Sequence, residues 1–379
     1  MTDQTLLLSA RDGDPTFRYA SGFEVESGLY LRFGDADDVL CVSALEFGRA
    51  GAQGTAARVV DRADLGWAEG TDENLNWARV AERLLRERDR SRVHIGADLP
   101  AGLYAALLER GVAVEIDPAL FVAERRTKSE GEVARIQEAQ DAAQAALRAV
   151  VHELRETRQG DDGRLWRGSA PLTSERLLAR CQEVLLEHGC ANLEAIIAGS
   201  PECAMPHFRG AGPIRAAAPV IIDIFPRHLA SGYHGDLTRT VVIGEVAPQI
   251  ASMHEACVAA MADSMAALGQ GADGREVHLA TCRALVAHGF GSMVPGLEGP
   301  PGGPRMIHST GHGVGLQVHE PPALRDTPYP LLAGDVVSVE PGLYRDGLGG
   351  VRVEDLVLVT AEGFRNLTQL PASLDPAAY

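Results

Sequence analysis

The sequence is organised around one stretch, Met306-Ile-His-Ser-Thr-Gly-His-Gly-Val-Gly-Leu-Gln-Val-His-Glu320, in which three histidines fall within twelve residues. They are His308, His312 and His319, and glycines flank the middle one. Histidine is the commonest nitrogen ligand for metals, and glycine lets the backbone approach a bound ion closely. A histidine cluster alone is weak evidence for a metal site, so the interpretation depends on its partners elsewhere in the chain.

Four acidic residues lie in apolar, strand-like segments on both sides of this stretch. They are Asp223 in Val-Ile-Ile-Asp-Ile-Phe, Asp236 in Asp-Leu-Thr-Arg-Thr, Glu340 in Val-Val-Ser-Val-Glu-Pro-Gly and Glu354 in Val-Arg-Val-Glu-Asp. A carboxylate within an apolar strand is costly unless it is paired or bound to a metal. We therefore expect a shared sheet to bring the four acids together.

Four carboxylates and the imidazole of His312 form a donor set that is mostly oxygen and contains no thiolate. Such a set suits Mn²⁺ and also accepts Zn²⁺, Co²⁺ or Fe²⁺. Because four acids would repel one another around a single ion, we expect two ions about 3.5–4 Å apart. An ion pair of this kind lowers the pKa of a bound water and polarises a carbonyl group. The expected reaction is therefore hydrolysis.

Composition excludes several other classes of protein. The chain has 379 residues and a net charge of -17, so it lacks the electrostatic footprint of a protein that binds nucleic acid or an anionic membrane. No apolar run is long enough to cross a bilayer, and the N-terminus has no signal-peptide pattern, so we expect a cytoplasmic location. Six scattered cysteines predict reduced core thiols, without a disulfide framework or a structural zinc site.

Lys128 is the only lysine, which argues against two further enzyme classes. A pyridoxal enzyme needs a Schiff-base lysine, and a P-loop needs glycines before its Lys-Ser/Thr pair. Lys128 precedes Ser129 without those glycines, in the polar stretch 124–128, which has the composition of a linker.

The apolar pattern predicts two domains with a boundary at this linker, at residues 1–124 and 125–379. The first is expected to be an α/β scaffold without a catalytic constellation, with strands at 27–33, 39–42, 92–95 and 112–116 and helices at 74–88 and 100–110. In the second, a capping box of Ser129 and Glu132 begins a long helix towards Leu154. Further helices are expected at 172–188, 249–270 and 276–288, and an exposed loop at 159–170.

Together, the acidic and histidine motifs resemble those of the pita-bread metallopeptidases, which include methionine aminopeptidase, aminopeptidase P and prolidase. The motifs are Asp223 with Asp236-Leu-Thr-Arg-Thr, His308-Ser-Thr-Gly-His312-Gly-Val-Gly-Leu-Gln-Val-His319-Glu, Val339-Glu340-Pro-Gly-Leu-Tyr and Val351-Arg-Val-Glu354-Asp. The resemblance implies an α+β architecture, with an N-terminal creatinase-like α/β domain and a C-terminal pita-bread domain built on a curved antiparallel sheet. Methionine aminopeptidase lacks the first domain, so the match is closest to the proline-directed branch and to bacterial Xaa-Pro dipeptidases.

The resemblance also implies roles for individual residues. Two metal ions would be held by Asp223, Asp236, His312, Glu340 and Glu354, with Asp236 and Glu354 bridging them. Glu340 would also shuttle the proton of the bridging water that attacks the imide carbonyl, and His319 and His207 would flank the scissile bond. Arg352 and Thr238 would hold metal-binding carboxylates in place. Taken by itself, His308 is expected to be a structural histidine that satisfies backbone groups near the site.

One feature departs from the family pattern. Family members usually carry glycine two residues after the first aspartate, where this chain has Phe225-Pro226, and their loop to the second aspartate is shorter. We therefore expect the hairpin between Asp223 and Asp236 to differ in shape.

The expected activity is hydrolysis of Xaa-Pro dipeptides by a homodimer, and the alternative is an aminopeptidase P that acts on longer peptides. A metal-free creatinase-like enzyme and a non-catalytic binding protein are weaker alternatives, because both would be expected to lack metal ligands. A dipeptidase needs a cation for the proline carboxylate, and the candidates are Arg209, Arg305, Arg325 and Arg345. Asp355 is expected to face away from Glu354, and the other histidines, His234, His254, His278 and His288, to be solvated or packed.

Overall fold

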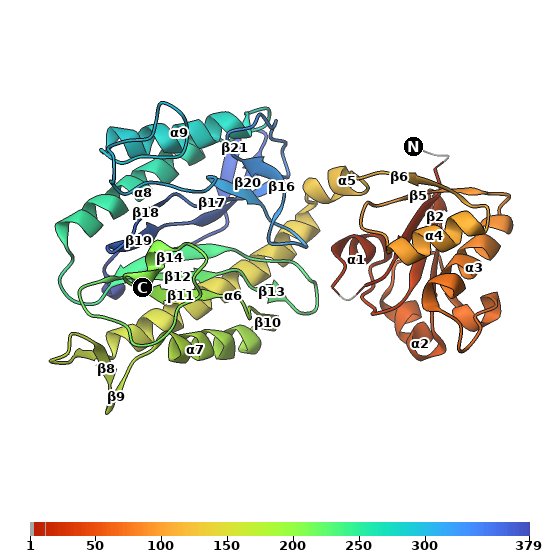
Figure 1. The fold of residues 1–379 in the computed structure, drawn as a ribbon, viewed down its shortest axis with the longest axis horizontal. Coiled ribbons are helices and arrows are strands. Elements are labelled where there is room, and N and C mark those ends of the chain that lie inside the picture. Colours follow the sequence, from red (N-terminus) through yellow and green to blue (C-terminus); the bar gives the residue numbers. More distant parts are fainter. Residues whose placement is uncertain (1–3, 12) are drawn as a thin grey trace. The chain divides into compact units, whose positions relative to one another are not determined.

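The computed structural model describes residues 4–11 and 13–379, and the chain forms two compact units that divide between Arg125 and Arg126 (Figure 1). The first unit contains one mixed sheet with strand order β4-β3-β2-β1-β5-β6. Its strands are β1 (Leu6–Ser9), β2 (Leu29–Gly34), β3 (Asp37–Val42), β4 (Arg58–Asp61), β5 (Arg92–Ile95) and β6 (Ala113–Ile116). Its helices are α1 (Pro15–Ser21), α2 (Ala44–Gln53), η1 (Arg62–Leu65), α3 (Glu73–Arg86) and α4 (Ala101–Glu109), and the division falls before the last residue of α5 (Val122–Arg126).

Both faces of this sheet are buried. Side chains alternate along a strand, so Leu7 of β1 packs in the cluster formed with α3 and α4, whereas Leu6 and Leu8 pack in the cluster that includes α1. Burial on both faces explains why the strands are apolar at consecutive positions, as in Leu6-Leu-Leu8.

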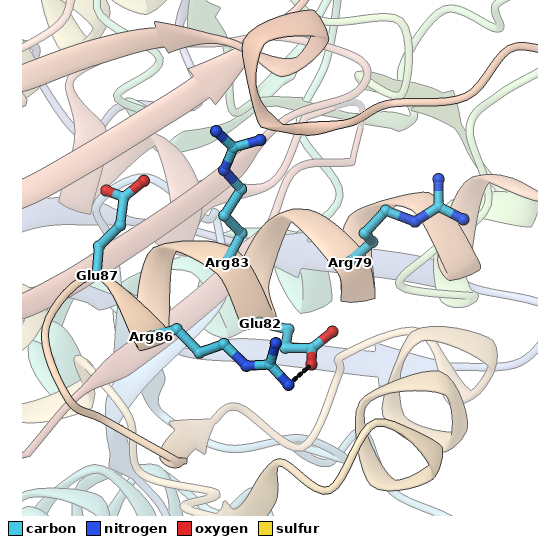
Figure 2. Close-up of a pocket in the computed structure, with 5 residues that line it drawn as sticks. All are labelled: Arg79, Glu82, Arg83, Arg86 and Glu87. Carbon is cyan, nitrogen blue, oxygen red and sulfur yellow. Dashed lines mark ion pairs between the residues drawn. The ribbon is translucent and has the colours of Figure 1, made fainter.

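The outer face of helix α3 is charged. Figure 2 shows four side chains of this face, Arg79, Glu82, Arg83 and Arg86, together with Glu87, which directly follows the helix, and Arg86 is turned toward Glu82. Glu82 pairs with Arg86 at 2.5 Å and with Arg110 at 2.6 Å. Arginine and glutamate at helical spacing form solvated ion pairs of this kind on many helices, so this face has the character of ordinary surface.

The first half of the second unit packs a helix pair on a three-stranded antiparallel sheet, β11-β12-β14. The helices are α6 (Glu130–Arg155) and α7 (Ser174–Glu187), and the strands are β11 (Ile196–Gly199), β12 (Pro219–Ile224) and β14 (Leu237–Val242). The predicted capping box is confirmed, because the Ser129 side chain accepts from the Glu132 N–H and the Glu132 carboxylate accepts from the Ser129 N–H.

The second half repeats this arrangement with another helix pair and a five-stranded antiparallel sheet, β16-β15-β17-β20-β21 (Figure 1). The helices are α8 (Pro248–Ala266) and α9 (Gly274–Ala287). The strands are β15 (Gly311–Gly313), β16 (Glu320–Leu324), β17 (Val336–Val339), β20 (Asp355–Thr360) and β21 (Gly363–Asn366), and the hairpin β18 (Gly342–Arg345) and β19 (Gly349–Arg352) lies beside them.

The sheets of the two halves are joined at β14. A β-bridge links Thr238 to Glu354, and the Thr240 hydroxyl bonds both the carbonyl and the N–H of Arg352, at 2.9 and 3.0 Å. Residues far apart in sequence therefore meet where β14 connects the two halves.

The prediction of an exposed loop at 159–170 was wrong in part, because most of the segment is exposed but it is not a continuous loop. This segment contains the short strands β7 (Arg158–Gln159), β8 (Leu165–Arg167) and β9 (Ala170–Pro171). Its glycines make the turns between them, and Leu165 is fully buried in the core of the first half. Composition therefore missed the strand pairing and the burial of Leu165.

Three smaller elements complete the second unit: the strand pair β10 (Cys190–Ala191) and β13 (Arg227–His228), and the 3₁₀ turns η2 (Glu202–Ala204) and η3 (Pro376–Ala378). All six cysteines are free and buried, as predicted. Among the helices of the described residues, none is long and apolar enough to cross a bilayer.

Candidate metal centre

Three of the four predicted carboxylates meet where the two sheets join. Asp223 lies in β12, Asp236 directly precedes β14, and Glu354 lies beside Thr238 of β14. One oxygen from each carboxylate lies within 4.8 Å of the other two, and the three residues are no more than 8% exposed. The structure therefore gathers these acids as the resemblance implied, although they lie up to 131 positions apart.

The prediction that Glu354 stands inside a strand was wrong. β19 ends at Arg352 and β20 begins at Asp355, so Glu354 lies between two strands of different sheets. Its N–H donates to the carbonyl of Thr238 at 3.0 Å, and the preceding N–H of Val353 donates to Pro341. The apolar pattern is continuous through this point, so it could not show that the chain changes hydrogen-bonding partners there.

His312 and Glu340 bring the remaining donors to the same cluster. His312 lies in β15, and its Nε2 is 3.7 Å from Asp236 Oδ2 and 3.4 Å from Glu340 Oε1. Glu340 directly follows β17, where its N–H donates to the carbonyl of Thr310. All five residues of the predicted metal-binding set thus line one cavity.

A hydrogen-bonded chain runs behind the carboxylates. Arg352 donates to Asp223 Oδ2 at 2.5 Å, to the Tyr344 hydroxyl at 2.8 Å and to the Thr238 hydroxyl at 3.3 Å. The Tyr344 hydroxyl lies 2.9 Å from Nε2 of His308. These bonds fix the orientation of Asp223, and through Thr238 that of Glu354 as well.

His308 is held in one tautomer by its neighbours. Its Nδ1 lies 2.7 Å from the carbonyl of Ser309, which can only accept, so Nδ1 carries the hydrogen. Nε2 therefore accepts from the Tyr344 hydroxyl. His308 thus bonds Tyr344 while lining the cavity.

The cavity over the carboxylates has a volume of about 630 Å³. The predicted flanking histidines, His207 and His319, line it, and the ring centroids of His319 and His312 are 4.2 Å apart. Phe225, which stands where the family usually has glycine, lines it as well.

Of the four candidate arginines, the structure places two in this cavity. Arg209 and Arg325 line it, whereas Arg305 and Arg345 line a separate recess of about 500 Å³. Arg209 pairs with Glu194 at 2.5 Å. The side chain of Arg325 makes no ion pair or hydrogen bond with any residue that the structure describes.

Without cations, the ionised form of the buried carboxylates is destabilised. Burial raises the pKa of Asp236 and of Glu354 well above the ordinary value, and repulsion among the carboxylates adds to this. Burial also raises the pKa of Glu340 to about 8, against the opposing effect of Arg352. Burial lowers the pKa of His312 to about 4, which keeps its ring neutral and able to bind a metal.

The donor set fits divalent ions. Within the predicted metal-binding set, four carboxylates are accompanied by one guanidinium, that of Arg352 on Asp223, so an excess of negative charge remains there when all four are ionised. A single dication would leave part of this excess uncompensated, whereas two would offset it. Oxygen donors with one imidazole, in a buried pocket, are a suitable environment for two borderline or hard dications.

Three residues that support the site were missed from the sequence. Tyr344 joins Arg352 to His308; Ser338 accepts from the N–H of His312 at 3.2 Å; and the Gln140 amide makes two bonds to the backbone of Asp236. Ser338 stands two residues before Glu340, so strand alternation could have placed it on the same face. A glutamine among alanines on the buried face of α6 was a comparable signal.

Residues 134–361 match the sequence model of metallopeptidase family M24. The chain belongs to this family. Divalent metal ions are therefore expected at the carboxylate cluster, and the family predicted from the motifs is confirmed.

One relative of this M24 protein is the Xaa-Pro dipeptidase of Pyrococcus furiosus, which is 30% identical over 254 residues, covering 66% of this chain and 64% of that one. This chain spans between about half and two thirds of the length of the curated relatives that it matches first.

Solved structures share the fold of this M24 protein over nearly its whole length. The X-Pro aminopeptidase of Thermotoga maritima has a TM-score of 0.80 at 21% identity, over 98% of this chain and 97% of that one. The Xaa-Pro dipeptidase of Bacillus anthracis has a TM-score of 0.80 at 23% identity, over 98% and 94%. The expected α+β class with a pita-bread domain is therefore confirmed.

Proposed function

We propose that this M24 protein is an exopeptidase that hydrolyses Xaa-Pro dipeptides with two divalent ions, preferably Mn²⁺, and that Co²⁺ or Zn²⁺ can replace them. The observation that carries the proposal is the convergence of Asp223, Asp236, His312, Glu340 and Glu354 on one cavity that also contains an arginine without a partner among the described residues. A creatinase-like or purely binding function is disfavoured because the whole donor set is present.

Bound ions would supply a nucleophilic water at neutral pH and polarise the scissile carbonyl. In the proposal, Glu340 accepts the proton of that water at its carboxylate, which Ser338 contacts at 3.5 Å. His207 and His319 stand at the cavity wall, where a ring N–H can donate to the carbonyl oxygen as negative charge develops on it. The free amine of the substrate would meet the metal site.

Arg325 is proposed to bind the carboxylate of the proline residue. It directly follows β16, and Ala323, two residues earlier, lines the same cavity, so both project to one face of the chain. A guanidinium binds a carboxylate through two parallel hydrogen bonds. Arg209 is the less suitable candidate because it already pairs with Glu194.

The test is a panel of Ala-Pro, Ala-Pro-Ala and Ala-Ala, each run with Mn²⁺, Co²⁺ and Zn²⁺. We expect hydrolysis of Ala-Pro and little or none of the other two peptides. Cleavage of Ala-Pro-Ala alone would establish the alternative, an aminopeptidase P. No cleavage of any peptide by protein that contains two ions per chain would overturn the proposal.

Two further proposals concern the state of the protein in the cell. Six free, buried thiols support a reducing compartment, and we propose the cytoplasm. The family resemblance supports a homodimer, and we propose that state. A sedimentation profile of a dimer would support this proposal, whereas the profile of a monomer would contradict it.

A further inference from the structure

The only lysine of the chain forms a buried ion pair with the residue that follows His319. Lys128 Nζ lies 2.7 Å from Glu320 Oε1, and the two side chains are 1% and 4% exposed. The sequence placed Lys128 in a polar linker, so this burial was not expected. Lys128 does not line the cavity, and it has no direct contact with the carboxylate cluster.

The backbone on the lysine side is fixed from two directions. The N–H of Lys128 donates to the carbonyl of Gly334 at 2.9 Å, and Gly334 has a φ of +97° that other residues rarely adopt. Ser129 is the N-cap of helix α6. The lysine side chain therefore extends from an anchored point, and its ammonium group has a defined position.

Glu320 stands at the end of the turn that connects two histidines of the cavity. It pairs with Gly313 in the β15–β16 ladder, and its Oε2 accepts from the N–H of Gln317 at 3.4 Å. A Cβ atom at Gly315 would overlap the Glu320 carboxylate. The carboxylate thus lies inside the turn between His312 and His319, against Gly315 and the N–H of Gln317.

We propose that Lys128 is a positioning residue, whose ammonium group holds Glu320 and thereby sets His319 against His312 at the cavity wall. The kinetic part of this inference rests on the proposed peptidase function. The geometric part, that the ion pair sets the orientation of the His319 ring, is independent of any activity.

The energetics favour a role in geometry over a role in stability. Removing two charges from water costs about as much as their attraction returns, so buried ion pairs often contribute little more than apolar residues of the same volume. An apolar pair could therefore serve the fold equally well. A charged pair adds direction, because the carboxylate must point its oxygen at the ammonium group.

The same segment contains a matched control. Arg126 pairs with Asp335 at 2.7 Å, with side chains 11% and 0% exposed, and Asp335 also accepts from the N–H of Leu332. This pair resembles that of Lys128 and Glu320 in burial and in sequence position. Arg126 makes no hydrogen bond or ion pair with the turn between His312 and His319, so its substitution measures the cost of breaking a buried pair in this segment while Lys128 and Glu320 remain paired.

The experiment compares Lys128→Met, Glu320→Gln, the double variant, Lys128→Arg and the control Arg126→Met in the full chain with Mn²⁺. We expect Lys128→Met to lower kcat for Ala-Pro at least tenfold, with KM and metal content near the wild-type values, because His319 acts on the transition state. Arg126→Met should keep kcat within twofold although its Tm falls. The double variant should be no worse than either single variant, and Lys128→Arg should retain more activity than Lys128→Met.

A second readout does not depend on activity. The imidazole NMR signals of His319, assigned with a His319→Gln variant, should shift in Lys128→Met and stay unchanged in Arg126→Met. A Lys128→Met protein that keeps kcat within twofold and the His319 signals unchanged would overturn the inference. If Lys128→Met does not fold, kcat for Ala-Pro and the His319 signals are measured in Glu320→Gln and Lys128→Arg instead. A wild-type protein inactive on every peptide would contradict the proposed function only, since the NMR shifts would still test the positioning.

Discussion

The hydroxyl of Thr238 donates to Glu354 Oε2 across 2.6 Å, and the N–H of Glu354 donates to the carbonyl of Thr238 across 3.0 Å. This double link joins the sheets of the two halves of the second unit. Because Asp236 lies two residues before Thr238, the link also places Glu354 in the carboxylate cluster. Asp355, the next residue, faces the other way and pairs with Arg239 at 2.7 Å.

Two neighbouring substitutions should therefore have different effects. Glu354→Gln removes one charge from the cluster, and we expect at least one ion per chain to be lost and kcat/KM for Ala-Pro to fall by about 10³ or more. Asp355→Asn should keep both ions and most of the activity. We expect Asp355→Asn to lower the free energy of unfolding by only about 1–3 kcal/mol, because Arg239 retains its bonds to backbone carbonyls.

Metal analysis by mass spectrometry and urea unfolding would measure these two outcomes. Full metal content in Glu354→Gln would contradict the assignment of Glu354 as a ligand. Loss of metal in Asp355→Asn would show that the two residues do not have the separate roles given to them.

Removing the metal should lower the thermal stability of the protein. An ion present at a hundred times its dissociation constant stabilises the folded state by about 2.7 kcal/mol, which corresponds to roughly 5–10 °C for a unit of this size. We expect a chelator to lower the Tm by this amount in calorimetry and to abolish activity. Excess Mn²⁺ should restore both the Tm and the activity. An unchanged Tm would mean that the carboxylate cluster holds no ion.

Arg325 should determine how tightly a dipeptide binds. Arg325→Met removes the proposed partner of the substrate carboxylate, so KM for Ala-Pro should rise by roughly 10- to 100-fold, the range expected for a charge-assisted bond of about 1.5–3 kcal/mol. The control is Arg305→Met, since Arg305 lines a separate recess. Steady-state kinetics that show equal effects of the two substitutions would contradict the assignment.

Protonation of His254 should destabilise the protein in acid. His254 lies in α8 with its Nε2 buried and without a hydrogen-bond partner among the described residues, and burial lowers its pKa from 6.5 to about 4. The folded protein therefore binds this proton more weakly than the unfolded chain does. The stability contribution of the neutral ring is complete above pH 6.5 and is lost as the pH falls toward 4.

At pH 5 this loss amounts to about 2 kcal/mol. We expect His254→Gln to show a smaller fall in unfolding free energy between pH 7.5 and pH 5 than the wild type, by about that amount, in urea unfolding of the metal-free protein. His288→Gln, which changes an exposed histidine, should follow the wild-type profile. Parallel profiles for wild type and His254→Gln would contradict the prediction.

Much of the local structure could be predicted because it depends on near neighbours in sequence. Helix α6 follows from its capping box and its apolar spacing, and β5 was predicted with its observed bounds, Arg92–Ile95. The exposed loop predicted at 159–170 was wrong in part, because the short strands there are stabilised by pairing with each other and by the burial of Leu165, which composition does not encode.

The surroundings of the candidate site depended on the folded chain. Tyr344 was not singled out from the sequence, because nothing local indicates that its hydroxyl lies between Arg352 and His308. Nor could the sequence show which of four arginines binds the substrate carboxylate, because only the folded chain shows which recess each side chain lines.

By itself, the sequence determined the family and the chemical type of the site, because the spacing and identity of Asp223, Asp236, His312, Glu340 and Glu354 are properties of the chain alone. The tertiary structure decided which groups orient these side chains. It placed Lys128 in a buried ion pair with Glu320. The physical reason is that orientation and burial come from contacts between segments more than a hundred residues apart, and no local pattern records those contacts.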